Sequence, residues 1–184
     1  MSEPVLKKLY SQKTIAAHVR RLGEEISRDF AGEDILCVGV LKGAFLFFSD
    51  LVRRLTVASS VDFVRVASYG SGTQSSGIVE LRQDLETTVQ GRNVIIIDDI
   101  LDTGFSLQFL YHHLQGRRPK TLKTCVLLDK TGNRKIPFAA DYVGMALESG
   151  FVVGYGLDYQ ERYRSLADIY LLQENQAASA RGLA

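Results

Sequence analysis

The sequence predicts an α/β protein in which helices flank an open, mainly parallel sheet. Three runs rich in Val, Ile and Leu lie at residues 35–41, 93–97 and 122–128. Such runs are typical of parallel strands that are buried on both faces. Segments with helical spacing of apolar residues are interspersed among them, which is the pattern of α/β units. A length of 184 residues suits one domain with its own core.

Three helices are expected along the chain. The first covers residues 11–30, where Ser11 can cap the amino terminus and Ala31-Gly32 ends the segment. Its apolar residues recur at spacings of three and four: Ile15, Val19, Leu22 and Ile26. The second helix follows a turn at Lys42-Gly43, and its apolar side is Phe45, Phe48, Leu51, Val52 and Leu55. The third runs from about Thr103 to Gln115.

The remaining strands are shorter or more polar. Residues 61–67 alternate apolar with charged positions and predict a strand, and residues 141–147 predict the last core strand. Residues 78–82 predict a short antiparallel strand outside the main sheet. Two further short strands are expected at residues 151–153 and 169–172.

The terminal pieces lie outside the alternating core, and we expect them to form a small hood within a single domain of residues 1–184. Segments 1–30 and 148–172 contribute to this hood. Residues 173–184 have few large apolar side chains and predict a frayed tail. Residues 68–77 are rich in glycine and hydroxyls and lack any aliphatic residue, so they predict a mobile loop.

Composition argues against several classes of protein. The 22 basic and 21 acidic residues give a net charge of +1, so no global field favours nucleic acid or an anionic membrane. No apolar run reaches the ~18 residues of a membrane span, and the amino terminus does not resemble a secretory signal. Cys37 and Cys125 lie in strand-like runs and predict buried free thiols. We therefore expect a cytoplasmic protein.

The most informative stretch is residues 94–106. Its apolar strand runs into Asp98 and Asp99, which we expect at the carboxyl end, where α/β sheets bind ligands. Two acids there are also typical of a solvated turn. However, Asp98, Asp99 and Asp102 have no basic residue nearby in sequence, and like charges so close are unfavourable unless a cation or hydroxyl donors bind.

The turn after these acids predicts a phosphate site. Asp102 is followed by Thr103-Gly104-Phe105-Ser106 and then by a helical pattern. Free backbone amides, a glycine and two hydroxyls at a helix amino terminus suit a phosphate, although Asp or Thr there is also a common cap. Carboxylates beside an amide cradle match the needs of a sugar phosphate. The G-x-G-x-x-G and Walker phosphate motifs are absent from their required contexts.

The 94–106 stretch also resembles the phosphoribosyl-pyrophosphate (PRPP) motif of the type I phosphoribosyltransferases. Further matches, spread over residues 36–168 in the same order, are similar to the hypoxanthine-guanine branch of the purine phosphoribosyltransferases. The resemblance implies the family's parallel sheet with a small hood, and it assigns residues 148–172 to the base site. It also implies transfer of the 5-phosphoribosyl group from PRPP to hypoxanthine and guanine, giving IMP or GMP and pyrophosphate, with Mg²⁺ in purine salvage.

The resemblance implies roles for the PRPP side of the site. Residues 40–44 look like the family's pyrophosphate loop, in which the Leu-Lys peptide is cis; the residues alone indicate only a strand-to-helix turn. Ser68-Tyr69 resembles the head of the family's lid, although a surface loop has the same composition. The implied PRPP and phosphate ligands are Lys42, Gly43, Asp98, Asp99, Asp102, Thr103, Gly104, Phe105, Ser106 and Arg164. The implied metal ligands are Asp158, Asp98 and Asp99.

The resemblance also implies a base site and a catalytic group. Lys130 would donate to the 6-oxo group of the purine, Phe151 would stack on it and the Val152 backbone would bind its edge, beside Asp158. Without the resemblance, a lysine in a basic loop is usually solvated and a Phe in an apolar run usually packs in the core. Asp102 is the implied general base or acceptor at purine N7.

Two departures from the family pattern concern the PRPP site. Asp98 stands where some members have Glu, which shortens the reach to the ribose hydroxyls. Phe105 stands where other members have Lys, so the 5′-phosphate depends more on amides, Thr103 and Ser106.

Two alternatives remain open from the sequence. One is a xanthine- or adenine-preferring enzyme of the same fold; Lys130 argues against adenine because an ammonium only donates. The other is a PRPP-fold regulator that binds RNA or DNA, against which the net charge of +1 and the presence of Asp102 both argue. A homo-oligomer, dimer or tetramer, is expected from the resemblance.

Overall fold

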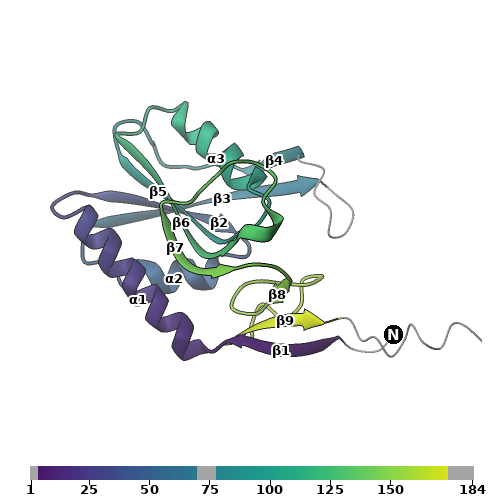
Figure 1. Ribbon diagram of the computed structural model, residues 1–184. Helices are drawn as coiled ribbons and strands as arrows, with labels where there is room; N and C mark the ends of the chain where they lie inside the picture. Colours follow the sequence, from purple (N-terminus) through teal and green to yellow (C-terminus); the bar gives the residue numbers. More distant parts are fainter. Residues whose placement is uncertain (1–3, 70–77, 174–184) are drawn as a thin grey trace, which may run out of the picture.

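The fold is built on a six-stranded, mainly parallel sheet with helices on both faces, as the sequence predicts (Figure 1). The computed structural model describes residues 4–69 and 78–173. The strand order is β4-β3-β2-β5-β6-β7, and neighbouring strands are parallel except β3 and β4. These strands are β2 (Ile35–Leu41), β3 (Ser59–Tyr69), β4 (Ile78–Gln83), β5 (Asn93–Leu101), β6 (Thr121–Lys130) and β7 (Tyr142–Leu147).

Of the three α-helices in the described residues, two cover one face of this sheet and the third covers the other. The helices α1 (Gln12–Asp29) and α2 (Phe45–Val52) share a buried cluster with Ile95 and Ile97 of β5. The helix α3 (Phe105–Gln115) shares a second cluster with Val94 and Ile96. Because successive side chains of a strand point to opposite faces, residues 94–97 of β5 contribute to the buried clusters on both faces of the sheet.

The first helix forms as its apolar spacing predicts. Its four expected core positions are each at most 2% exposed: Ile15, Val19, Leu22 and Ile26. The Ser11 hydroxyl accepts a hydrogen bond from the Thr14 amide at 3.2 Å, which caps the helix.

The first and last strands of the described residues meet in a separate three-stranded antiparallel sheet, drawn below the main sheet in Figure 1. Its order is β1-β9-β8, with β1 at Val5–Tyr10, β9 at Ile169–Gln173 and β8 at Phe151–Val153. The sequence did not predict β1, because Val5–Tyr10 has two lysines and no regular alternation. Of the described residues before Ala31, only β1 lies in this small sheet, since α1 packs on the main one.

The prediction for residues 78–82 is wrong in one respect. The strand β4 is antiparallel, as expected, but it belongs to the main sheet, where it pairs with the edge of β3. Its Leu81 packs against the cluster beneath α3, so the strand adds to the core. Pairing also covers backbone groups that β3 would otherwise present as an open edge.

Both cysteines are free and fully buried, as the sequence predicts. Burial raises the pKa of the Cys37 thiol to about 12 and raises that of Cys125 further, so neither is a ready nucleophile. Within residues 4–69 and 78–173, none of the helices combines the length and apolar character that crossing a membrane requires.

The buried part of β5 should dominate stability. Ile96 is fully buried, so Ile96→Ala is expected to lower the free energy of unfolding by about 2–5 kcal/mol, and Ile96→Val by about 0.5–1.5 kcal/mol. Urea denaturation followed by circular dichroism measures both. Val61→Ala is the matched control because Val61 is 49% exposed, and its effect should stay within about 0.5 kcal/mol. Equal losses at the two positions would contradict this account of the core.

Candidate functional site

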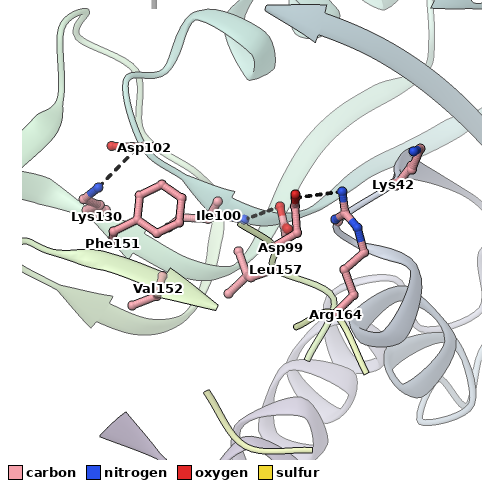
Figure 2. A pocket seen from close by; sticks show the side chains of 11 residues that line it. Lys42, Asp99, Ile100, Asp102, Lys130, Phe151, Val152, Leu157 and Arg164 are labelled. Carbon is pink, nitrogen blue, oxygen red and sulfur yellow. Dashed lines mark hydrogen bonds and ion pairs between the residues drawn. The ribbon is translucent and has the colours of Figure 1, made fainter. Parts of the chain in front are cut away.

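A cavity of about 310 Å³ opens at the carboxyl ends of β5 and β6 (Figure 2). Nine predicted site residues line it: Lys42, Gly43, Asp99, Asp102, Lys130, Phe151, Val152, Asp158 and Arg164. Ile100 and Leu157, which the sequence did not single out, complete the lining. The topology explains the location, because the carboxyl ends of parallel strands lie on one edge of the sheet.

The pairing between β2 and β5 ends just before Asp98 and Asp99, which leaves space beside these two acids. The last pair between β2 and β5 is Gly39 with Ile97, whereas β5 stays paired with β6 as far as Leu101. Asp98 and Asp99 therefore follow the point where β2 leaves its neighbour. Both acids belong to the strand itself, which is longer than the sequence predicted.

The two acids are buried side by side, at 8% and 9% exposure. Asp98 accepts a hydrogen bond from the Asp99 amide at 3.0 Å, and Asp99 accepts one from the Ile100 amide at 2.9 Å. Burial raises the pKa of Asp98 well above its usual range, and the adjacent Asp99 charge adds to the rise. Burial also raises the pKa of Asp99, against which the Arg164 cation acts. Bound hydroxyls or a cation would relieve this cost.

The turn after β2 lies directly against Asp99. The Leu41–Lys42 peptide is cis, as the resemblance implies. A Cβ atom at Gly43 would lie 1.9 Å from the Asp99 Oδ2 atom, so no larger residue fits there without a shift. Gly156, at a φ of +99°, approaches the Gly43 carbonyl just as closely, since a Cβ atom there would lie 2.1 Å away. These contacts bring the turns after β2 and β8 to one wall of the cavity.

One side of the cavity is cationic, but its cations are paired within the protein. Lys42 Nζ lies 3.0 Å from Glu161 Oε2, and Arg164 Nη2 lies 3.4 Å from the same oxygen. Arg164 also pairs with Asp158 at 2.7 Å and donates to the Gly156 carbonyl. The sequence did not predict Glu161, because an acid in a polar turn carries no local signal. Its carboxylate lies where an external anion would meet both cations.

The opposite side combines an acid, a lysine and an aromatic ring. Lys130 Nζ donates to Asp102 Oδ2 at 3.2 Å, and Asn133, also not predicted, donates to Asp102 Oδ1 at 2.7 Å. Phe151 is 37% exposed and meets Tyr159 edge-on, with ring centroids 5.5 Å apart. A ring that lines the cavity is open to a flat ligand. Figure 2 shows Phe151 beside the Asp102–Lys130 pair.

The predicted phosphate turn lies next to Asp102 and outside the cavity lining. The helix α3 begins at Phe105, and Gly104 precedes it with a φ of +96°, a conformation that favours glycine. The Lys135 amide donates to the Thr103 carbonyl at 3.0 Å, which fastens the turn to the loop after β6. Amides of a first helical turn lack intrahelical acceptors, so this turn can bind an anion. The roles of Thr103, Gly104, Phe105 and Ser106 stay predictions.

The remaining predicted residues take other places. Asp98 is buried and does not line the cavity. Ser68 and Tyr69 end β3, whose backbone pairs them with Val79 and Ile78 of β4. The loop that follows, residues 70–77, lies outside the described residues, so the lid stays a prediction.

The acids could contribute to a magnesium site. Mg²⁺ prefers oxygen ligands and is usually held by one or two carboxylates together with substrate phosphates and water. Asp99 and Asp158 both line the cavity and match that requirement. Among the described residues, no three His, Cys, Asp or Glu side chains form a cluster that could hold a metal. The residues thus fit an ion that is bound together with a phosphorylated ligand.

Comparisons with known proteins agree with this geometry. The model of the phosphoribosyl transferase domain matches residues 5–160. The hypoxanthine-guanine phosphoribosyltransferase of Aquifex aeolicus is 42% identical over 170 residues, which cover 92% of this chain and 96% of that protein.

Two solved structures show the same fold. The hypoxanthine-guanine phosphoribosyltransferase of Bacillus anthracis superposes with a TM-score of 0.86 at 38% identity, covering 92% of this chain and 99% of that one. The hypoxanthine phosphoribosyl transferase of Trypanosoma cruzi, solved to study how its C-terminal region affects oligomeric state and activity, gives 0.87 at 38% identity over 100% and 99% of the two chains. The chain therefore belongs to the phosphoribosyl transferase family, in its hypoxanthine-guanine phosphoribosyltransferase branch.

Proposed function

We propose that the protein transfers the 5-phosphoribosyl group of PRPP to hypoxanthine and guanine, releasing pyrophosphate and giving IMP or GMP for purine salvage. The observation that carries the proposal is one cavity lined at one side by Lys42 and Arg164 and at the other by Asp102 and Lys130. The first pair suits a pyrophosphate, and the second suits a 6-oxopurine. The names of the most similar relatives support the same activity.

The cationic side would bind the leaving group. Lys42 and Arg164 can each donate to phosphate oxygens, and the planar guanidinium of Arg164 can donate two parallel hydrogen bonds to one phosphate. The backbone at Gly43 can approach closely because no side chain intervenes. Charge that builds on pyrophosphate as its bond to C1′ breaks would be stabilised by these fixed cations.

The acids and the turn before α3 would hold the sugar. Asp98 and Asp99 can accept hydrogen bonds from the 2′- and 3′-hydroxyls, directly or through metal, and the 103–106 amides can bind the 5′-phosphate. Asp99 and Asp158, with Asp98 as the third expected ligand, would hold Mg²⁺. The ion supplies positive charge that neutralises the pyrophosphate.

The opposite side would bind and activate the base. The Lys130 ammonium can donate to O6 and cannot accept from an amino group, which favours 6-oxopurines over adenine. Phe151 can stack on the ring while the Val152 backbone binds its edge. N9 forms the bond to C1′ as the C1′–pyrophosphate bond breaks, and the Asp102 carboxylate accepts the proton on N7.

Assembly and location are part of the proposal. We expect a homo-oligomer, dimer or tetramer, in the cytoplasm; the study of the Trypanosoma cruzi relative, which concerns its oligomeric state, makes assembly the natural property to examine. We expect neither nucleic acid nor a membrane as a partner, consistent with the net charge of +1.

The direct test offers hypoxanthine, guanine, xanthine and adenine separately with PRPP and Mg²⁺ and measures nucleotide formation. Turnover of hypoxanthine or guanine is expected, and Asp102→Asn should lower kcat by about 10²-fold or more because it removes a proton acceptor. Turnover mainly of xanthine or adenine would overturn the assignment of the base. PRPP binding without turnover of any base would favour a regulator.

Substrate must displace Glu161 from the cations. Glu161→Gln is expected to lower the KM for PRPP about two- to fivefold, because the neutral amide competes less well for Lys42 and Arg164. Steady-state kinetics with varied PRPP measures this change. Glu24→Gln makes the same charge change on the exposed side of α1 and should leave KM unaltered. A higher KM in Glu161→Gln would mean that Glu161 organises the cations for PRPP.

Burial of Asp98 should lower the free energy of unfolding at neutral pH, although the residue is needed for turnover. The pKa of Asp98 is raised in the folded state, so the contribution of Asp98 to stability should fall as pH rises from about 4, the unfolded value, through that raised pKa. Asp98→Asn stays neutral and should be more stable than the wild type at pH 7, with no advantage at pH 4, while losing turnover. Urea unfolding in metal-free buffer tests this. Asp34→Asn, at an exposed position, should show no such gain; a destabilised Asp98→Asn at pH 7 would refute the prediction.

A further inference from the structure

Both carboxylate oxygens of Asp102 are engaged, but their donors differ in kind. Lys130, the donor to Oδ2, lines the cavity, whereas Asn133, the donor to Oδ1, does not. A carboxylate only accepts, so the amide nitrogen of Asn133 must face it. The bond from Asn133 is also the shorter, at 2.7 Å against 3.2 Å.

Asn133 is held in place by the backbone around it. It ends a 3₁₀ turn, Thr131–Asn133, directly after β6. The Gly132 amide donates to the Glu148 carbonyl at 2.9 Å, so close that a Cβ atom at Gly132 would lie 2.4 Å from that oxygen. On the other side, Lys135 donates to Thr103, next to Asp102 itself. The turn is thus fixed at both ends relative to the acid.

The two hydrogen bonds to Asp102 should respond differently when substrate binds. If the proposed function holds, Lys130 turns toward the 6-oxo group of the base and gives up Oδ2, which then faces the N7 proton. Asn133 does not line the cavity, so it can keep its bond to Oδ1. Without that bond the carboxylate could rotate about its side-chain torsions once Lys130 leaves, and alignment of the acceptor would be lost.

We propose that Asn133 is a positioning residue, which fixes Oδ1 of Asp102 so that Oδ2 is the oxygen presented to the purine. It acts only through Asp102 and touches neither substrate. The proposal rests on the proposed function, yet it makes a separate prediction. The cations that would bind the pyrophosphate, Lys42 and Arg164, lie at the opposite side of the cavity, and the amide of Asn133 donates to Asp102. The affinity for PRPP should therefore change little when Asn133 is replaced.

The test compares Asn133→Leu, of similar size without a donor, with Asn133→Gln, which keeps the amide. Asn133→Leu should lower kcat about tenfold or more with the dissociation constant for PRPP unchanged, and Asn133→Gln should restore part of kcat. Thr131→Ala, an exposed position in the same turn, is the matched control and should keep full turnover. Thermal unfolding checks that each variant is folded.

A double-mutant cycle with Asp102→Asn is decisive. If Asn133 acts through Asp102, adding Asn133→Leu to Asp102→Asn should lower kcat no further. An equal loss in both backgrounds, a parallel loss of PRPP affinity, or unchanged kcat in Asn133→Leu would overturn the proposal. Absence of turnover in the wild type would instead reject the proposed function.

Discussion

Burial of two adjacent carboxyl groups at the end of β5 is the constraint around which the rest of the site is arranged. Asp98 and Asp99 continue a strand whose previous four residues form the centre of the core. The turn after β2 packs closely on them, because a side chain at residue 43 would fit only if Asp99 moved. The same turn contacts Gly156, which follows β8, through the carbonyl of Gly43. The segments after β2 and β8 are thereby packed together next to the two acids.

The free protein keeps its charged groups paired with one another. Glu161 lies between Lys42 and Arg164, and Asp102 receives Lys130 and Asn133. The side chains of Lys130 and Arg164 are largely buried, so their pairings compensate charges that would otherwise be left without a partner, whereas Lys42 and Glu161 are exposed. A ligand that binds in such a site replaces these internal partners. The free energy of binding therefore depends on how much more strongly the charged groups interact with the ligand than with one another.

The sequence predicted features that depend on local pattern. Apolar runs marked the central strands, helical spacing marked α1, and the acids before Thr103-Gly104 marked the ligand edge. It did not predict β1, since pairing with β9 joins residues at opposite ends of the chain. It also placed β4 outside the sheet, because a short strand does not reveal its neighbour. Glu161 and Asn133 were not predicted because their roles come from contacts 119 and 31 residues away.

The small terminal sheet ties the wall that would bind the base to the last residues described. Phe151 and Val152 pair with Leu172 and Leu171 of β9, and β9 pairs with β1. During synthesis the main sheet can therefore assemble from strands that emerge early, whereas Phe151 and Val152 gain their strand partner only after β9 has been made. A nascent chain, or one clipped before Ile169, would have the two acids and Lys130 in the main sheet, with Lys42 directly after β2, but would lack the strand that supports Phe151 and Val152.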